Sequence, residues 1–501
     1  MNGDQDTERV RTDYATSPVR TTREMSEPHR ERGWAIAITA GALLLFGVAA
    51  ALTAPDTTEP GELGRTGLIT VLVFVAAVLG WTSNRLDDTF VALAAAAALV
   101  VLGALDAEQL FASLGDDQIW LLVAAFVLAA GINRTGLPAR LAVALVGQAR
   151  SARGLFHLIT LGLLATALLV PSTSGRAALV VPFYCALAGA FAARPRLVRA
   201  LALLFPAVVL LSAVATLVGA GAHLITSQIL DAAIGSGIGF GQWLLWGLPF
   251  AAVSSHLAAE LVLVLFTTRA DRREQLRIDA ADLREKLDVP VQVQRAEIRA
   301  IAVLGSVVML WSTEALHGLS PALIALGGAL LITSPRFGTV RIGAAIGEIP
   351  WSLLLFMAAT AALGSALTSS GAASWIASEV LSGDDALTLL IAVVALSTAA
   401  HLLVQSRSAR SSVLIPLVVP AAIAVGANPV ALAFASTAAA GFCHTLPSSA
   451  KPVAMFARLD QVPTYEPRDL RKLSALLGPA LAALVVLFAL FGWPLLGLPL
   501  V

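Results

Sequence analysis

Charged residues are scarce in this chain of 501 residues, where they make up only 13% of the sequence. A globular protein usually carries about a quarter, so these charges cannot cover a water-facing surface of this size. The 33 basic and 33 acidic residues balance, which excludes the surplus of positive charge that nucleic-acid binding requires. Cys185 and Cys443 are the only cysteines, which excludes a disulfide framework and a Cys/His metal cluster. What is abundant is apolar: 57% of the residues are hydrophobic and the mean hydropathy is +0.81, which indicates a membrane protein.

The first 32 residues are hydrophilic and contain no apolar core of a cleavable signal. They mix acidic residues with the arginines Arg9, Arg11, Arg20, Arg23, Arg30 and Arg32. Such a segment cannot bury enough apolar surface to fold alone, so we predict a disordered cytoplasmic tail over 1–32.

Apolar stretches long enough to cross about 30 Å of hydrocarbon recur along the rest of the chain. Eleven of them are predicted to be transmembrane helices, at roughly 33–54, 65–81, 89–105, 117–131, 199–230, 242–267, 298–312, 319–334, 350–366, 428–456 and 474–491. Two further segments, 154–192 and 387–425, are too long for one crossing and are interrupted near the middle by Ser, Gly and Arg. Each of them is either two full spans or a re-entrant helical hairpin.

The distribution of Lys and Arg gives an orientation, because these residues gather in short cytoplasmic loops. With a cytoplasmic amino terminus and two hairpins, the outer loops contain no Lys or Arg; they lie near 106–116, 231–241, 312–318, 382–386 and 426–429. Two full spans in place of either hairpin would preserve this alternation, although the interrupted centres favour hairpins. The carboxyl terminus is then predicted outside the cytoplasmic membrane, and 268–297 is a solvated cytoplasmic linker.

Two stretches of sequence are repeated at a constant spacing. PSTSGRAALVVP (171–182) is echoed by QSRSARSSVLIP (405–416), and the Trp-led stretch 117–142 is echoed by 349–377. Residues 65–267 and 298–501 are therefore predicted to be repeats, preceded by a first helix and outer loop over 33–64. Because their first spans run in opposite directions, the repeats are inverted, which is the architecture of many secondary transporters.

The centres of the two interrupted segments, here called the first and second tips, suit an anion. Each begins a helix inside the membrane, where free N–H groups and the positive end of the helix dipole attract negative charge. Hydroxyl groups and close backbone approach come from Ser172, Thr173, Ser174 and Gly175 in the first tip and from Ser406 and Ser408 in the second. Arg176 and Arg410 stand at matching places, whereas Arg407 has Thr173 as its counterpart. Each arginine either binds substrate or caps a tip and pairs with a carbonyl.

Two further interruptions, here called the first and second breaks, fall at 216–227 and 441–456. Their composition is typical of unwound helix within the membrane, and they contain Gly219, Gly221 and His223, and Ser448, Ser449 and Lys451. Lys451 is either a third cation for the substrate or a side chain that reaches the inner interface. His256 and Glu260, four residues apart on one helix, either carry protons or form a packed polar pair.

At these residues the sequence resembles the divalent-anion/sodium symporter (DASS) family of the ion-transporter superfamily, which also holds citrate, arsenite and sodium/proton carriers. The resemblance covers roughly 65–491 and rests on the Trp-led segments, the paired tips and the Gly-rich breaks. It implies eleven spans, two re-entrant hairpins, a homodimer whose protomers each have a scaffold and a moving transport domain, and elevator-type alternating access.

The family's tips carry Ser-Asn-Thr, whose side chains hold substrate carboxylates while neighbouring backbone carbonyls hold sodium. The matching residues here are Ser172, Thr173 and Ser174, and Ser406, Arg407 and Ser408, so both asparagines are absent. The coupling ion is Na⁺ or H⁺, for which Gly219, Gly221, Ser448, Ser449, His256 and Glu260 are candidate residues. The additional cations Arg176, Arg407, Arg410 and Lys451 would take over the electrostatic role of sodium, which suits proton coupling, exchange or an inorganic anion.

The sequence thus predicts an all-α polytopic membrane protein that transports a small dicarboxylate, tricarboxylate or sulfate. It predicts no enzymatic activity, cofactor or metal site, and its partners are the anion, the bilayer and a second copy of the chain. A sodium/proton or arsenite-type carrier is the first alternative, although no carboxylate lies within either tip. An intramembrane serine protease is suggested by Thr173-Ser174-Gly175 and a histidine, but the recurrence of the pattern at 406–410 favours a symmetric binding site. A channel or a purely structural membrane protein is a further alternative.

Overall fold

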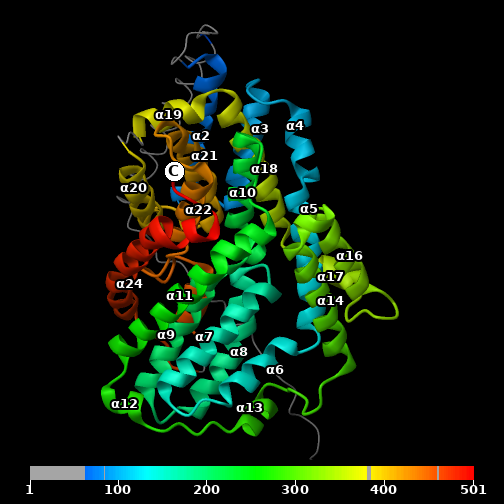
Figure 1. Cartoon of the computed structure of the whole chain (residues 1–501), viewed down its shortest axis with the longest axis vertical. Coiled ribbons are helices and arrows are strands. Elements are labelled where there is room, and N and C mark those ends of the chain that lie inside the picture. Colours follow the sequence, from blue (N-terminus) through cyan, green and yellow to red (C-terminus); the bar gives the residue numbers. More distant parts are fainter. Residues whose placement is uncertain (1–52, 54–62, 84, 381–384, 460–461) are drawn as a thin grey trace, which may run out of the picture. The chain divides into compact units, whose positions relative to one another are not determined.

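The computed structural model describes residues 53, 63–83, 85–380, 385–459 and 462–501. These residues are almost entirely helical and contain no β-strand (Figure 1). Seven helical stretches among them are long and apolar enough to span a membrane, which agrees with the predicted all-α polytopic class. The predicted tail over 1–32 and nearly all of the predicted first helix and loop over 33–64 lie outside the described residues.

The first helices after residue 62 begin and end at local sequence signals. They are α2 (Arg65–Ser83), α3 (Asp88–Val101), α4 (Ala107–Ala112), α5 (Asp117–Asn133) and α6 (Leu137–Val146). Asp87 caps α3 by accepting hydrogen bonds from the backbone N–H groups of Thr89 and Phe90. Gly136 adopts a left-handed conformation with φ 74°, which allows the sharp turn from α5 into α6. Helices α4 and α6 were not predicted.

Both interrupted segments consist of two helices. The first contains α7 (Ala152–Leu169) and α8 (Thr173–Ala190), and the second contains α20 (Ala386–Ala399), the short 3₁₀ helix Ala400–Leu402, and α21 (Arg407–Ala424). Ser172 caps α8 by accepting a hydrogen bond from the Gly175 N–H, and Ser406 caps α21 in the same way through Ala409. The tips are therefore places where one helix ends and another begins.

Both breaks are present as well. The predicted span 199–230 is divided into α9 (Pro195–Leu211), two 3₁₀ turns (Ser212–Ala215 and Leu217–Gly219) and α10 (Gly221–Ile234). The predicted span 428–456 is divided into α22 (Pro429–Ala439) and α23 (Lys451–Ala457). Gly219 is required in the first break, because a Cβ atom there would lie 2.1 Å from the Ala213 carbonyl oxygen.

The order of the helices repeats along the chain. The later helices include α14 (Arg295–Ser312), α16 (Pro321–Thr333), α17 (Ile342–Gly347), α18 (Trp351–Ser369) and α19 (Ala372–Val380). The starts of α7, α8 and α9 lie 234 residues before those of α20, α21 and α22. The packing is reciprocal too, since α5 packs against α16 while their counterparts α18 and α3 pack against each other.

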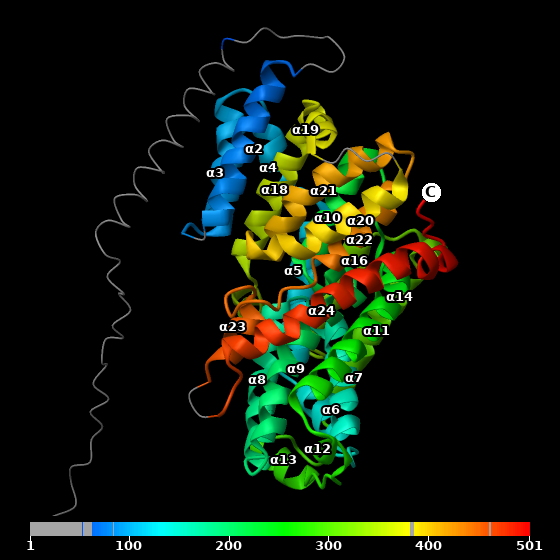
Figure 2. The same ribbon diagram turned by 90° about the vertical axis from the view of Figure 1, so that its left-hand side faces the viewer.

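The parts of the chain before and after 268–297 contact each other through α11 (Phe240–Phe266) and α24 (Pro467–Leu487), each of which packs on the broken helix before it. The segment 268–297 contains α12 (Arg269–Arg273) and α13 (Ala280–Lys286), which lie beside α6, α7 and α8 (Figures 1 and 2). Leu276 and Leu283 are buried there, and Arg140 of α6 pairs with the buried Glu297 at 2.8 Å. The linker is therefore packed against the helices and not only solvated.

Candidate functional site

A cavity of about 400 Å³ lies where the tips and breaks converge. Of the predicted site residues, it is lined by Ser172, Thr173, Ser174, Gly221, Ser406, Arg407, Ser408, Ser448 and Lys451. Helix α10, which follows the first break, packs against α21, which follows the second tip. Gly221 makes this approach possible, because a Cβ atom there would lie 3.2 Å from the Ser408 Oγ and 2.9 Å from a Leu353 methyl group. The fold thus brings together residues that are more than 180 positions apart in sequence.

Arg407 is a half-buried cation that lines this cavity. It occupies the first position of α21, and its NH1 group donates a long hydrogen bond of 3.4 Å to the Leu210 carbonyl at the end of α9. Its Nε and NH2 groups have no hydrogen-bond partner within the described parts of the chain. Gly441 of the second break leaves room for the guanidinium group, since a Cβ atom there would lie 3.2 Å from NH2. Unpartnered guanidinium donors beside a cavity favour an anionic ligand.

Arg176 lies outside the cavity, and its side chain is 0% exposed. Its Nε donates to Thr166 Oγ1 at 3.0 Å, and its NH1 donates to the Val209 carbonyl at 3.1 Å. Its NH2 donates to the Leu163 carbonyl and to Ser212 Oγ, both at 2.6 Å. The sequence allowed Arg176 either to bind substrate or to pair with carbonyl groups. Its hydrogen bonds in the structure are those of the second role.

Arg410 is the counterpart of Arg176, but its surroundings differ. Its side chain is 1% exposed and also does not line the cavity. The NH2 group contacts Cys443 Sγ at 2.7 Å, whereas Nε and NH1 have no partner among the residues that the structure describes. Because Cys443 lines the cavity, this contact places Arg410 directly behind the cavity wall.

The cavity also contains acidic residues that were not predicted. Asp87 and Asp88, at the start of α3, line it together with Ser406 of the second tip. Lys451 is exposed to the cavity at the first position of α23, and its charge acts on Asp88. Sequence reasoning missed these aspartates because helix caps of this kind are common and α3 is distant in sequence from both tips.

Other predicted residues of the tips and breaks do not line the cavity. The N–H group of Gly175 donates to the capping hydroxyl group of Ser172. Gly219 is buried inside the first break. His223 is buried, with Nδ1 2.9 Å from the Thr216 carbonyl and its ring stacked on Trp243. Ser449 is buried, and its Oγ accepts a hydrogen bond from the Leu446 N–H.

His256 and Glu260 belong to a separate polar cluster between α7 and α11. They contact His157 rather than each other: Nδ1 of His157 lies 2.8 Å from Nδ1 of His256, and Nε2 of His157 lies 2.6 Å from Oε1 of Glu260. Arg153 pairs with the same Glu260 oxygen at 2.6 Å. None of the four residues lines the cavity at the tips.

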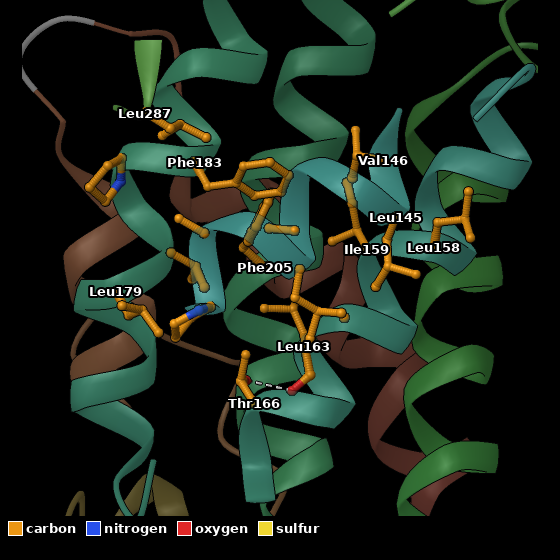
Figure 3. Close-up of a pocket in the computed structure, with 17 residues that line it drawn as sticks. Leu145, Val146, Leu158, Ile159, Leu163, Thr166, Leu179, Phe183, Phe205 and Leu287 are labelled. Carbon is orange, nitrogen blue, oxygen red and sulfur yellow. Dashed lines mark hydrogen bonds between the residues drawn. The ribbon is translucent and has the colours of Figure 1, made fainter. Parts of the chain in front are cut away.

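A second cavity, of about 230 Å³, lies between α6, α7 and α8 (Figure 3). The lining residues labelled in Figure 3 are apolar apart from Thr166, whose hydroxyl group donates to the Leu163 carbonyl. It has no charged side chain in its lining, so it does not provide the donors that a polyvalent anion needs.

Comparisons with known proteins identify the family. A family profile described as "Sodium:sulfate symporter transmembrane region" matches residues 42–498. The chain is 25% identical over 363 residues to the putative malate transporter YflS of Bacillus subtilis, covering 70% of this chain and 74% of that protein. It is 22% identical over 427 residues to the sodium-dependent dicarboxylate transporter SdcS of Staphylococcus saprophyticus, covering 79% of this chain and 81% of that protein. It is 24% identical over 321 residues to a membrane protein of Cupriavidus necator. This alignment covers 62% of this chain and 61% of that protein, so the chain spans less than two thirds of this relative.

The chain therefore belongs to the sodium:sulfate symporter family, and the predicted membership of the DASS family is confirmed. It is a multi-pass membrane protein of a symporter family whose relatives are named as transporters of malate and of dicarboxylates. The relatives named as sodium-dependent indicate sodium as a coupling ion in this family.

Proposed function

We propose that this chain is a secondary active transporter of a small di- or multivalent anion, which binds in the cavity between the tips. The observation that carries the proposal is Arg407, which lines the cavity and whose Nε and NH2 groups, themselves buried, have no partner in the described structure. A cation without an acceptor is unfavourable, and an anionic substrate toward which the Arg407 side chain turns would supply the missing acceptors.

Other groups around the cavity add to an anion site, although Asp87 and Asp88 also line it and bring negative charge. The first turns of α8 and α21 both face it, and the hydroxyl groups of Thr173, Ser174 and Ser408 border it. Lys451 adds a second positive charge at the rim. Two charged ends of one molecule can thus be bound at once, by the arginine of the second tip and by the hydroxyl and N–H groups of the first.

The dimensions of the cavity support a small polyvalent substrate. About 400 Å³ lies at the lower end of the usual range for small-molecule sites. A dicarboxylate, a tricarboxylate or sulfate fits this space, and the relatives named for malate and dicarboxylate favour the carboxylates. We propose no enzymatic activity and no cofactor besides a coupling ion.

The packing of the helices supports an elevator-type mechanism. Helices α2, α3, α5, α14, α16 and α18 pack on one another. Helices α7, α8, α9, α11 and α23 form a second set, and α10, α20, α21, α22 and α24 form a third, in which α10 and α21 also contact α18. The α11–α24 contact joins the last two sets into one body that carries both tips. We propose that 65–267 and 298–501 are inverted repeats, with hairpins at 154–192 and 387–425. The tip-bearing body would move past the other helices in each protomer of a homodimer, with the amino terminus cytoplasmic and the carboxyl terminus outside.

Uptake by purified protein in liposomes tests the function. Radiolabelled succinate, malate, citrate, sulfate and phosphate are supplied under imposed sodium, proton or counter-anion gradients, with protein-free liposomes as the control. We expect saturable uptake of at least one divalent anion. Folded protein that takes up none of them under any gradient would refute the proposal.

One observation favours a second candidate, a sodium/proton or arsenite-type carrier. Such carriers need a carboxylate at the broken helices, and Asp88 provides one against Ser406 of the second tip. A proton or sodium flux in liposomes without any transported dicarboxylate or sulfate would support this candidate. The protease hypothesis gains no such support, because no histidine lines the cavity that Thr173 and Ser174 border.

A further inference from the structure

The guanidinium group of Arg176 is surrounded by four oxygen atoms. Two are the backbone carbonyls of Leu163 and Val209, and two are the hydroxyls of Thr166 and Ser212, all between 2.6 and 3.1 Å. Arg176 forms no ion pair with a carboxylate in the described structure. All ion pairs found there involve other residues. The positive charge is therefore balanced by carbonyl and hydroxyl dipoles alone.

This set of oxygen atoms, here called the oxygen cage, is of the kind that holds a hard metal cation. Thr166 lies in the last turn of α7, Val209 lies in the last turn of α9, and Ser212 directly follows α9. The carboxyl ends of helices carry partial negative charge. In transporters with broken helices, such ends and unwound carbonyls coordinate sodium.

A second guanidinium group reaches the same helix end. Arg407 of the second tip donates to the Leu210 carbonyl, which is next to the Val209 carbonyl that Arg176 contacts. The end of α9 thus already receives two fixed positive charges, one from each tip. A sodium ion placed there would be repelled by both and would find the oxygen cage filled.

The second tip does not reproduce the oxygen cage. At the 234-residue spacing, Thr166 corresponds to Ala400 and Ser212 to Leu446, neither of which has a hydroxyl group. Val209 corresponds to Cys443, whose sulfur atom is the one partner of Arg410 in the described residues. The second half therefore has two guanidinium groups with free donors, on Arg407 and Arg410, which attract anions and repel a metal cation.

We infer that Arg176 is a resident cation that fills the position of a coupling sodium ion in the first half, and that the chain moves its anion without sodium. The part that concerns transport rests on the proposed function. The residues of this chain do not fit the sodium ion that its sodium-dependent relatives imply, because two arginines occupy or border the places where oxygen atoms converge.

The inference about Arg176 is tested by thermal unfolding of the full-length protein in detergent, in sodium chloride and in choline chloride at equal ionic strength. Arg176→Ala empties the oxygen cage, so we expect sodium to raise the Tm of this variant by about 2 to 4 °C. Sodium should not change the Tm of the wild type or of Arg134→Ala, which removes an exposed arginine of the α5 end. An equal response of wild type and Arg176→Ala, or no response of Arg176→Ala, would overturn the inference.

Two measurements keep the inference testable if Arg176→Ala does not fold. Arg176→Lys retains a cation in the oxygen cage and should be insensitive to sodium; a sodium-dependent rise of its Tm would count against the inference. Uptake by the wild type should be equal in sodium and choline chloride, and a stimulation of about tenfold or more by sodium would overturn the claim of sodium-free transport. If no anion is taken up at all, the proposed function fails while the Tm comparison still decides the role of Arg176.

Discussion

Arg176 and Arg410 occupy equivalent positions, 234 residues apart, yet the first is hydrogen-bonded to four oxygen atoms and the second contacts one sulfur atom. The two halves of the site are therefore similar in backbone and different in charge balance. The first half has a compensated arginine behind a tip of hydroxyl groups. The second half has two guanidinium groups with unpartnered donors in the described structure, on Arg407 and Arg410, of which Arg407 lines the cavity.

Replacing Arg407 should weaken substrate binding more than it weakens folding. Arg407→Gln keeps a polar side chain at the first position of α21 but removes the charge beside the cavity. Hydrogen bonds to charged groups contribute about 1.5 to 3 kcal/mol, so we expect the KM for the transported anion to rise about 10- to 100-fold. The measurement is concentration-dependent uptake into liposomes, with Arg134→Gln as the matched loss of an exposed arginine. An unchanged KM would remove Arg407 from the binding site.

Arg410 and Arg176 should respond in opposite directions to the same substitution. Arg410→Met removes a buried charge whose Nε and NH1 have no partner in the described structure, so we expect a higher Tm in the absence of substrate. Arg176→Met takes a donor away from each of four oxygen atoms and should lower the Tm, by an amount equivalent to more than about 3 kcal/mol. Thermal unfolding of both variants in detergent decides the matter. A lower Tm for Arg410→Met would mean that its guanidinium group is compensated after all.

The first break should tolerate no side chain at Gly219. A Cβ atom there would lie 2.1 Å from the Ala213 carbonyl oxygen, and the close turn of backbone cannot move without disturbing the oxygen cage. Gly219→Ala should therefore reduce the yield of folded protein and lower the Tm of what remains. Gly189→Ala is the matched control, because the corresponding Cβ atom meets nothing within 4 Å and alanine favours the helix α8. Size-exclusion chromatography and thermal unfolding compare the two, and equal behaviour would contradict the prediction.

The tips and breaks could be predicted from sequence because the signals that interrupt a helix are local. Pro171 with Ser172, and Gly219 with Gly221, end or begin helices through their own backbone preferences and capping groups. Helix α6 carried comparable signals, since Gly136 is followed by Pro138 at the second helical position. It could have been predicted on the same grounds.

The roles of the arginines could not be predicted in this way. Arg176 and Arg407 both stand in the first turn after a tip, and only the distant carbonyls of α9 decide that the first is enclosed while the second borders the cavity. Asp88 and Ser406 line the same cavity although they are more than 300 residues apart in sequence. Such contacts depend on tertiary packing, which hydrophobic periodicity does not encode.

The cluster of His157, His256 and Glu260 should not be required for anion binding. It lies between α7 and α11, and none of its members lines the cavity at the tips. Glu260→Gln removes the charge that pairs with Arg153, a side chain that is 66% exposed, so the loss of stability should be no more than about 1 kcal/mol. We therefore expect uptake with unchanged KM and Vmax, measured in liposomes beside a Tm determination. If uptake is lost while the Tm is retained, the cluster carries protons that drive transport, and the coupling path runs through α7 and α11 instead of through the tips alone.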